Sequence, residues 1–313
     1  MKKQHYSVEE HGFYGVYDPH PAGSRAAIIA LMCLEVDNAL MRGFVRFLQS
    51  QGLNVLAMVP SPTNDGLCLF PLERFSAAIH MLKALGNERL AITGASATGM
   101  VALSAAARHP EFTLTLAMTP CDFVMEGYLR GKKDGTMERP GNDDSALTWR
   151  GKPLPFVPYA YRHPQYWQKI QEEGRTTGNK MASRNLFDTS EKMHPVREEE
   201  FIPVENIAGK LLLVGAEDDC LWDTCRYIRR MEKRLQARAH SCTLEAHTYI
   251  HGTHFIFPQA MVTNILPFGY NKAVGFFFKA ARENPQACMK TRQDVEEKFA
   301  RAIASWKEAP CAF

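Results

Sequence analysis

The sequence lacks the features that mark disulfide-rich, membrane-spanning or nucleic-acid-binding chains. Its eight cysteines include no CxxC pair, which favours free thiols in a reducing cytosol over a disulfide framework or a zinc site. It has no apolar run of about eighteen residues that could span a membrane, and the start, MKKQHYSVEEHG, lacks the apolar core of a secretory signal. The net charge of +3, without a long Lys/Arg block, gives no reason to expect nucleic acid. We therefore expect a cytoplasmic protein that needs no metal and no cofactor.

Short apolar runs alternate along the chain with stretches of helical spacing. Such runs are typical of strands buried on both faces of a parallel sheet, and their alternation with helices predicts right-handed crossovers. The expected strands are residues 26–32, 54–59, 89–93, 113–118, 210–214 and 242–246. The expected helices are one capped by Asn38 and stopped at Gly52, then 71–85, 97–108 and 222–235. The pattern predicts an α/β fold with a doubly wound, mostly parallel sheet.

The alternation stops between residues 121 and 207. This segment is rich in Gly, Pro, charged and aromatic residues, which favours an ordered lid because disordered segments contain few aromatics. We expect a single domain over residues 1–313, with a lead-in at 1–24, a lid at 121–207 and a docked C-terminal helix at 285–308. The helical spacing of Val295, Phe299, Ile303 and Trp306 predicts that last helix.

The stretch from Leu90 to Met100, LAITGASATGM, ends an expected strand in a tight turn with Ser96 at its apex. Two chemistries share this shape. In a nucleophile elbow, a serine is held on a strained strand-to-helix turn with its hydroxyl exposed. In a dinucleotide-binding turn, glycines let the backbone approach a pyrophosphate at the start of a helix.

The rest of the sequence favours the elbow. A dinucleotide turn needs a second glycine where Thr98 stands and a small residue where Met100 stands. An elbow requires an acid after a later strand and then a histidine. Asp218 and Asp219 follow the strand KLLLV, and the loop HTYIHGTHFIFP supplies His251 and His254.

These residues predict a Ser-His-Asp triad. A serine hydroxyl needs a base to take its proton, and imidazole titrates near neutral pH. We expect Ser96 as nucleophile, His254 as base and Asp219 as the acid that orients it, with Asp218 bonding the loop backbone instead. Asp218 remains the alternative acid. Backbone N–H groups of Ala97 and Leu34 are the expected oxyanion donors.

The same residues carry a family resemblance over residues 24 to 260. The chain resembles the α/β-hydrolase domain shared by acyl-CoA thioesterases and bile acid-CoA:amino acid N-acyltransferases. The resemblance is strongest in ALTWRGKPLPFVPY (146–159), IPVENIAGKLLLVGAEDDCLWDT (202–224) and GTHFIFP (252–258). By similarity, Ser96, Asp219 and His254 fall on the family's nucleophile, acid and base positions. The acyltransferase branch typically uses cysteine, so the serine favours hydrolysis of a small-molecule acyl ester or thioester.

Three departures from the family pattern keep alternatives open. Only about 25 residues precede the first expected strand, so we expect the family's preceding β-sandwich domain to be absent. Thr98 stands where the elbow usually has its last glycine, and the loop 32–37, MCLEVD, lacks the usual glycines. The alternatives are an acyl-CoA-dependent N-acyltransferase, an NAD(P)-dependent oxidoreductase using the TGAS turn, and a catalytically weak or inactive binding protein. A homo-oligomer also remains open.

Overall fold

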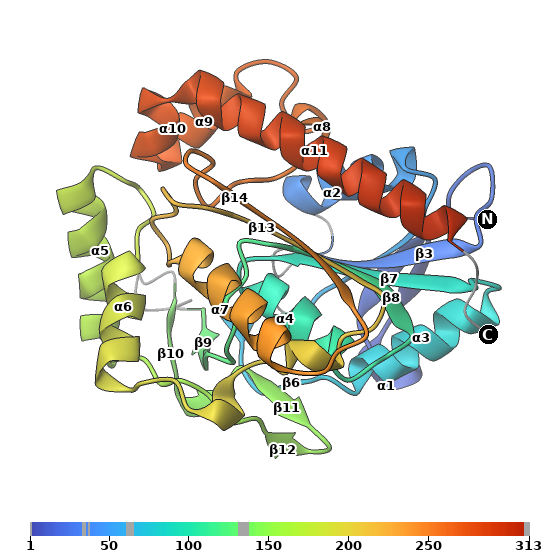
Figure 1. Cartoon of the computed structure of the whole chain (residues 1–313), viewed down its shortest axis with the longest axis horizontal. Helices are drawn as coiled ribbons and strands as arrows, with labels where there is room; N and C mark the ends of the chain where they lie inside the picture. Colours follow the sequence, from blue (N-terminus) through green and yellow to red (C-terminus); the bar gives the residue numbers. More distant parts are fainter. Residues whose placement is uncertain (1, 33–35, 37, 61–65, 131–137, 310–313) are drawn as a thin grey trace.

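The fold is built on one twisted sheet that crosses the molecule (Figure 1). The computed structural model describes residues 2–32, 36, 38–60, 66–130 and 138–309. These residues form an eight-stranded sheet in the order β1-β2-β4-β3-β7-β8-β13-β14, in which all strands from β4 onward pair in parallel. Its strands are β1 (Gln4–Tyr6), β2 (Gly15–Asp18), β3 (Ala26–Leu31), β4 (Asn54–Met58), β7 (Arg89–Ala95), β8 (Phe112–Met118), β13 (Lys210–Ala216) and β14 (Thr243–Tyr249). The prediction of a doubly wound, mostly parallel sheet is confirmed.

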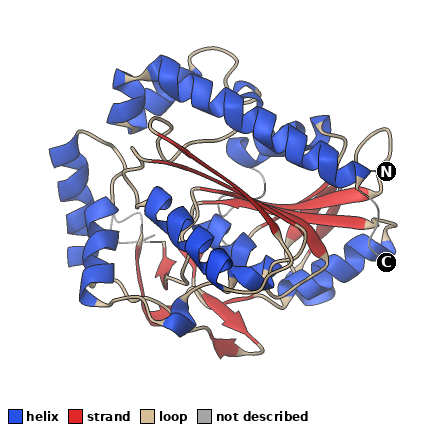
Figure 2. Cartoon of the chain, viewed as in Figure 1, coloured by secondary structure: helices blue, strands red, loops and turns tan. Residues whose placement is uncertain are grey.

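Helices cover both faces of this sheet (Figure 2). Every residue of β3 and β4 is buried, as the continuous apolar runs predict for strands covered on both sides. Two helices, α2 (Ala39–Ser50) and α11 (Pro285–Glu308), pack on one face. The other face carries α3 (Arg74–Ala84), α4 (Ala97–Ala106) and α7 (Thr224–Ala237).

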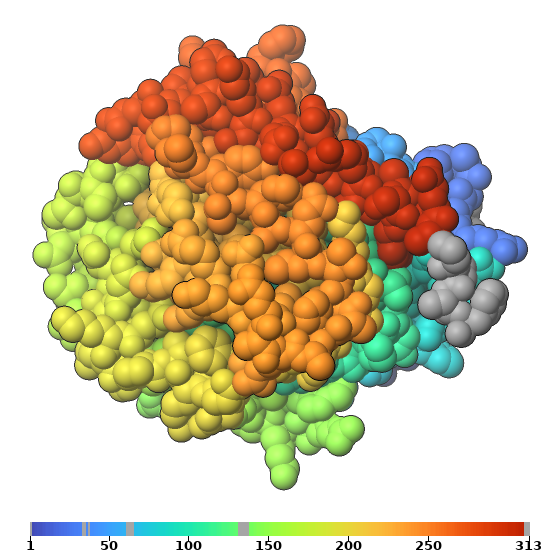
Figure 3. Space-filling view, viewed as in Figure 1, coloured from blue at the N-terminus to red at the C-terminus, as the bar shows by residue number. Residues whose placement is uncertain are grey.

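The helix ends follow local chemistry. The Asn38 side chain accepts a hydrogen bond from the Met41 N–H at 2.8 Å, so it caps α2 as its position predicts. Trp306 anchors the far end of α11, where its indole N–H donates to the Thr113 hydroxyl at 2.8 Å. In the space-filling view the red C-terminal segment, which includes α11, runs along the upper side of the molecule in contact with the rest (Figure 3). None of the helices in the described residues is both long enough and apolar enough to span a bilayer.

The N-terminal segment contributes structure that the sequence patterns miss. Residues 4–18 form β1, the short helix α1 (Val8–His11) and β2, and β2 pairs antiparallel with β4. The strands are three and four residues long, too short for a periodic pattern to register. Pro71 likewise ends the short strand β6 (Phe70–Pro71), so α3 begins at Arg74 and not at Pro71 as predicted.

Residues 121–207 contain two helices and four of the six strands of two small three-stranded sheets. One sheet pairs β9 (Glu126–Leu129) with β10 (Arg139–Ser145) and β5 (Gly66–Leu67), and the other pairs β11 (Leu147–Trp149) with β12 (Lys152–Pro153) and β6. The helices α5 (Gln165–Thr177) and α6 (Arg184–Met193) stand at the left of Figure 1. Two 3-10 turns, Glu198–Glu200 and Val204–Asn206, lead back to β13.

Three further helices that the patterns miss lie between β14 and α11. They are α8 (Gln259–Thr263), α9 (Tyr270–Phe277) and α10 (Lys279–Glu283). Two rings, from Phe277 of α9 and from Phe278 just after it, pack against the loop that carries His254, because they lie 6.2 and 4.8 Å from the Phe255 ring between centroids.

Burial of α11 against the sheet should dominate its contribution to stability. Phe299 on α11 is fully buried, whereas Phe276 on α9 is 60% exposed. We expect Phe299→Ala to lower the free energy of unfolding by about 3–5 kcal/mol, the cost of a buried cavity. Phe276→Ala, the matched control, should change it by less than about 0.5 kcal/mol. Urea denaturation followed by circular dichroism measures both, and equal losses would contradict the docking of α11.

Candidate active site

Ser96 occupies a sharp turn between β7 and α4. Its backbone has φ 58° and ψ −133°, a positive φ that a side chain bearing a Cβ rarely adopts. The turn is tight, since a Cβ added at Gly94 would lie 2.2 Å from the Thr98 carbonyl oxygen. Such strain costs on the order of 1–3 kcal/mol and is typical of functional sites. The geometry is that of a nucleophile elbow.

Three strand ends meet beside this turn. The Ser96 N–H donates to the Met118 carbonyl oxygen at 2.9 Å, and Met118 is the last residue of β8. The next residue, Thr119, is fully buried and donates its N–H to Val214 of β13 at 2.8 Å. Its hydroxyl lies 3.5 Å from the His254 carbonyl oxygen. The carboxyl ends of β7, β8 and β13 therefore bring the Ser96 and His254 segments to one edge of the sheet.

Asp219 and His254 form a buried pair at that edge. The His254 Nδ1 atom lies 2.8 and 3.0 Å from the two carboxylate oxygens of Asp219, and both residues are 2% exposed. The carboxylate also accepts hydrogen bonds from the Leu221 N–H at 2.9 Å and from the Thr224 hydroxyl. The opposite ring nitrogen, Nε2, is buried and has no hydrogen-bond partner among the described residues. The pair thus holds a histidine with one nitrogen fixed and the other left unpaired.

The neighbouring acid, Asp218, makes different contacts. Its carboxylate accepts from the Gly252 and Thr253 N–H groups at 3.0 and 2.7 Å, and His251 Nδ1 lies 3.2 Å away. It therefore ties down the backbone of the histidine loop, the contact that the sequence assigned to it. The two consecutive carboxylates bind the same loop at different points.

Thr98 fits into the elbow by using its hydroxyl. The side chain is 4% exposed, and its oxygen lies 2.7 Å from the carbonyl oxygens of both Leu31 and Ala95. The same oxygen accepts from the Ala95 N–H at 3.2 Å. Thr98 thus links the end of β3 to the residue before Ser96, a contact that glycine could not make.

Of the two expected oxyanion donors, Ala97 and Leu34, the structure describes Ala97. Ala97 is the first residue of α4, where a helix leaves its N–H groups without intrahelical acceptors. The positive end of the helix also favours an anion there. Leu34 lies outside the described residues.

An aromatic ladder that the sequence analysis missed connects His254 to the 121–207 segment. The Trp222 ring meets the His254 ring edge to face at 5.2 Å, and its indole N–H donates to the Thr119 carbonyl at 3.1 Å. Edge-to-face contacts then continue from Trp222 to Phe187 at 5.0 Å. Phe187 in turn contacts the Tyr159 ring, and Tyr159 contacts the Tyr166 ring, where the ladder ends. The available signal was Trp222, which stands three residues after Asp219.

Two cysteines that follow strand ends, Cys121 after β8 and Cys220 after Asp219, are poor candidates for a nucleophile. Burial, helped by the nearby Asp219, raises the pKa of the Cys220 thiol to about 12, and burial raises the pKa of Cys121 further. Both thiols stay protonated near neutral pH and are therefore poor nucleophiles. The described residues also contain no group of three His, Cys, Asp or Glu side chains arranged to hold a metal ion.

The sheet order, the strained serine turn and the Asp-His pair at the strand ends are those of an α/β-hydrolase fold. The chain belongs to the BAAT / acyl-CoA thioester hydrolase C-terminal family, whose model matches residues 70–263. The family resemblance found in the sequence is confirmed. No curated protein sequence matches the chain.

Solved structures show the same fold. A putative dienelactone hydrolase from Klebsiella pneumoniae is 13% identical, with 96% of this chain and 98% of that chain covered and a TM-score of 0.51. A dienelactone hydrolase-like promiscuous phosphotriesterase from metagenomic libraries is 9% identical, with 97% of each chain covered and a TM-score of 0.51. At these identities the likeness concerns the fold alone.

The role of the Thr98 hydroxyl can be tested by an isosteric change. Thr98→Val keeps the shape but leaves buried backbone groups of Leu31 and Ala95 without their partner, so we expect a loss of about 1–3 kcal/mol in the free energy of unfolding. Thr98→Ser keeps the hydroxyl and should lose less. Urea denaturation of the three proteins measures this, and a Val variant as stable as wild type would show that the hydroxyl contributes nothing.

Proposed function

We propose that this protein is a serine hydrolase that forms an acyl-enzyme on Ser96. The observation that carries the proposal is the unpaired Nε2 of His254, opposite a nitrogen fixed by Asp219, at the strand edge where the Ser96 turn projects. A buried, unpaired ring nitrogen is costly in a merely structural role, and its lone pair is free to accept a proton as a general base does.

The chemistry follows the acyl-enzyme route. His254 Nε2 takes the proton of Ser96 while the serine oxygen attacks the acyl carbonyl carbon. The Ala97 N–H stabilises the resulting oxyanion, and the histidine returns the proton to the leaving thiol or alcohol as its bond to carbon breaks. Water then attacks the acyl-enzyme with the same proton transfers, which frees the carboxylic acid and restores Ser96. Asp219 stays ionised and stabilises the imidazolium that forms twice in the cycle.

The substrate class we propose is an acyl thioester such as an acyl-CoA, or a carboxylic ester. Membership of a family described by acyl-CoA thioester hydrolysis supports the thioester. The same family name includes the N-acyltransferases, in which an amine would take the place of water. Ser96 in the nucleophile position favours water as acceptor, as the sequence analysis expected.

Covalent labelling tests the nucleophile directly. A fluorophosphonate probe phosphonylates an activated serine, so we expect wild-type protein to be labelled and Ser96→Ala to be unlabelled. Ser76→Ala, which changes an exposed serine on α3, is the matched control and should label like wild type. In-gel fluorescence gives the readout, with circular dichroism to show that each variant is folded. Equal labelling of Ser96→Ala and wild type would refute the proposal.

The two adjacent acids should differ sharply in kinetics. We expect Asp219→Asn to lower kcat by about 10⁴, as loss of the orienting carboxylate does in serine proteases. Asp218→Asn should lower it far less, because His254 keeps its contact with Asp219. Hydrolysis of p-nitrophenyl esters and acyl-CoA thioesters of graded chain length measures both variants. The opposite order of effects would make Asp218 the catalytic acid.

A further inference from the structure

A pocket of about 520 Å³ lies between Lys180 and the helices α9 and α10. Figure 1 places these helices above α5, at the end of the molecule opposite the N-terminus. The pocket is lined by Lys180, Asn271, Lys272, Gly275, Phe276, Ala281, Arg282 and Pro285.

Hydrogen bonds fix the three pieces of chain that form its walls. The Lys180 N–H donates to the Phe277 carbonyl oxygen at 2.8 Å, and the Lys279 N–H donates to the Asn179 side chain at 2.7 Å. The Arg282 guanidinium donates to the carbonyl oxygens of Gly275 and Gly178 at 2.8 and 3.2 Å. The segment 178–180, which follows α5, is therefore docked against α9 and α10, and the pocket is a formed feature of the surface.

The charges in this pocket are positive and uncompensated. Lys180, Lys272 and Arg282 all line it, and no acidic side chain of the described residues forms an ion pair with any of them. The ion pair of Lys279 with Glu283 at 3.8 Å lies on the same helix as Arg282, but neither residue lines the pocket. Three like charges around one cavity repel each other and attract an anion.

Apart from Asn271, whose side-chain oxygen accepts a hydrogen bond from Arg292, the remaining lining residues of the pocket are apolar. Phe276 is 60% exposed, and the Lys180 ammonium lies 5.5 Å from the centre of its ring. Gly275, Ala281 and Pro285 add apolar wall without hydrogen-bonding side chains. A ligand that fits must therefore combine a negative group with an apolar body.

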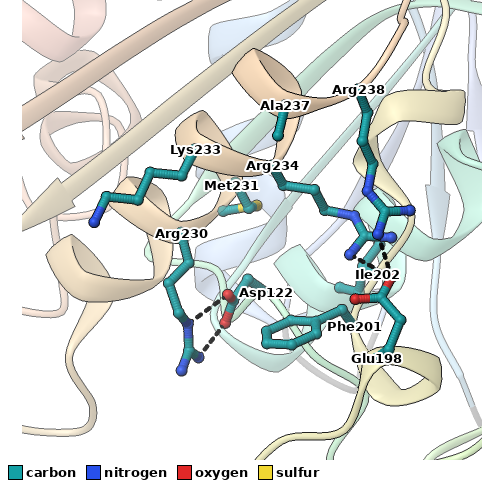
Figure 4. A pocket seen from close by; sticks show the side chains of 10 residues that line it. All are labelled: Asp122, Glu198, Phe201, Ile202, Arg230, Met231, Lys233, Arg234, Ala237 and Arg238. Carbon is teal, nitrogen blue, oxygen red and sulfur yellow. Dashed lines mark hydrogen bonds and ion pairs between the residues drawn. The ribbon is translucent and has the colours of Figure 1, made fainter.

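A second pocket, of about 330 Å³ beside α7, shows the contrast (Figure 4). Arg230 there pairs with Asp122, and both Arg234 and Arg238 pair with Glu198. Each of these arginines has an acidic partner within the protein: Arg234 and Arg238 connect the end of α7 to Glu198, and Arg230 connects α7 to Asp122. In the α9–α10 pocket, by contrast, none of the three lining cations forms an ion pair with an acidic side chain of the described residues.

We propose that the α9–α10 pocket binds an organic anion, a phosphate, sulfonate or carboxylate group attached to an apolar body. The negative group lies between Lys180, Lys272 and Arg282, and the apolar body lies against Phe276. The site adjoins the back of the histidine loop, because Phe276 contacts Phe277 at 5.3 Å and Phe277 contacts Phe255, next to His254. The proposal does not depend on the chemistry of Ser96.

A pair of fluorescent probes separates the contribution of charge from that of apolar contact. Anilinonaphthalene sulfonate carries a sulfonate, and phenylnaphthylamine is its uncharged analogue. We expect the double variant Lys180→Gln/Lys272→Gln to raise the Kd of the sulfonate about tenfold, the equivalent of about 1.4 kcal/mol. The Kd of the uncharged probe should not change. Phe276→Ala should weaken both probes.

The control is Lys279→Gln, which removes an exposed lysine of α10 that does not line the pocket. All titrations use the Ser96→Ala background, so the result is independent of whether Ser96 is a nucleophile. A double variant that binds the sulfonate like the Ser96→Ala parent and like the Lys279 control would overturn the proposal, since the probe would then be bound elsewhere.

Sedimentation with lipid vesicles identifies the source of the anion. Phosphatidylglycerol vesicles that carry down the parent protein but not the double variant would assign the site to a lipid headgroup, provided that phosphatidylcholine vesicles carry down neither. Charge-dependent probe binding without vesicle binding would assign it to a soluble organic anion. If neither measurement depends on Lys180 and Lys272, the pocket is not an anion site.

Discussion

The positive φ of Ser96 is the constraint around which the rest of the site is arranged. A strained turn persists only where its surroundings leave the chain no alternative. Here β7 is held between β3 and β8, and nine of the ten residues of α4 are buried, so both arms of the turn are fixed. Thr98 closes the turn from inside, through its contacts with Leu31 and Ala95. The free energy of packing the sheet offsets the local strain and keeps the hydroxyl at the strand edge.

The two consecutive acids illustrate where sequence reasoning reaches its limit. The motif GAEDD places an acid after β13, and the strand order then brings it to the histidine loop. The choice between Asp218 and Asp219 depends on which way each side chain leaves the turn, and this is set by partners distant in sequence, such as Gly252, Thr253 and His254. Residue order alone favours Asp219 without excluding its neighbour.

Much of the sheet could be predicted because buried parallel strands have continuous apolar runs, as in β3 and β13. The elements that were not predicted are too short to show a hydrophobic period: β2 is four residues long, and α8 and α10 are five each. The ladder through Trp222 and Phe187 was also missed, because its rings come from segments that only the tertiary fold brings together. The hydroxyl contacts of Thr98 escaped for the same reason, since Leu31 is far from it in sequence.

His254 is held from two sides by parts of the chain added to the central sheet. Trp222 packs on its ring and transmits contact with the 121–207 segment, while Phe255 anchors the loop to Phe277 and Phe278. Asp219 fixes Nδ1 and Asp218 fixes the loop backbone, so the direction of Nε2 is determined by packing and charge together. The 121–207 segment and the α9–α10 helices therefore pack, through one or two aromatic rings each, against the same histidine loop.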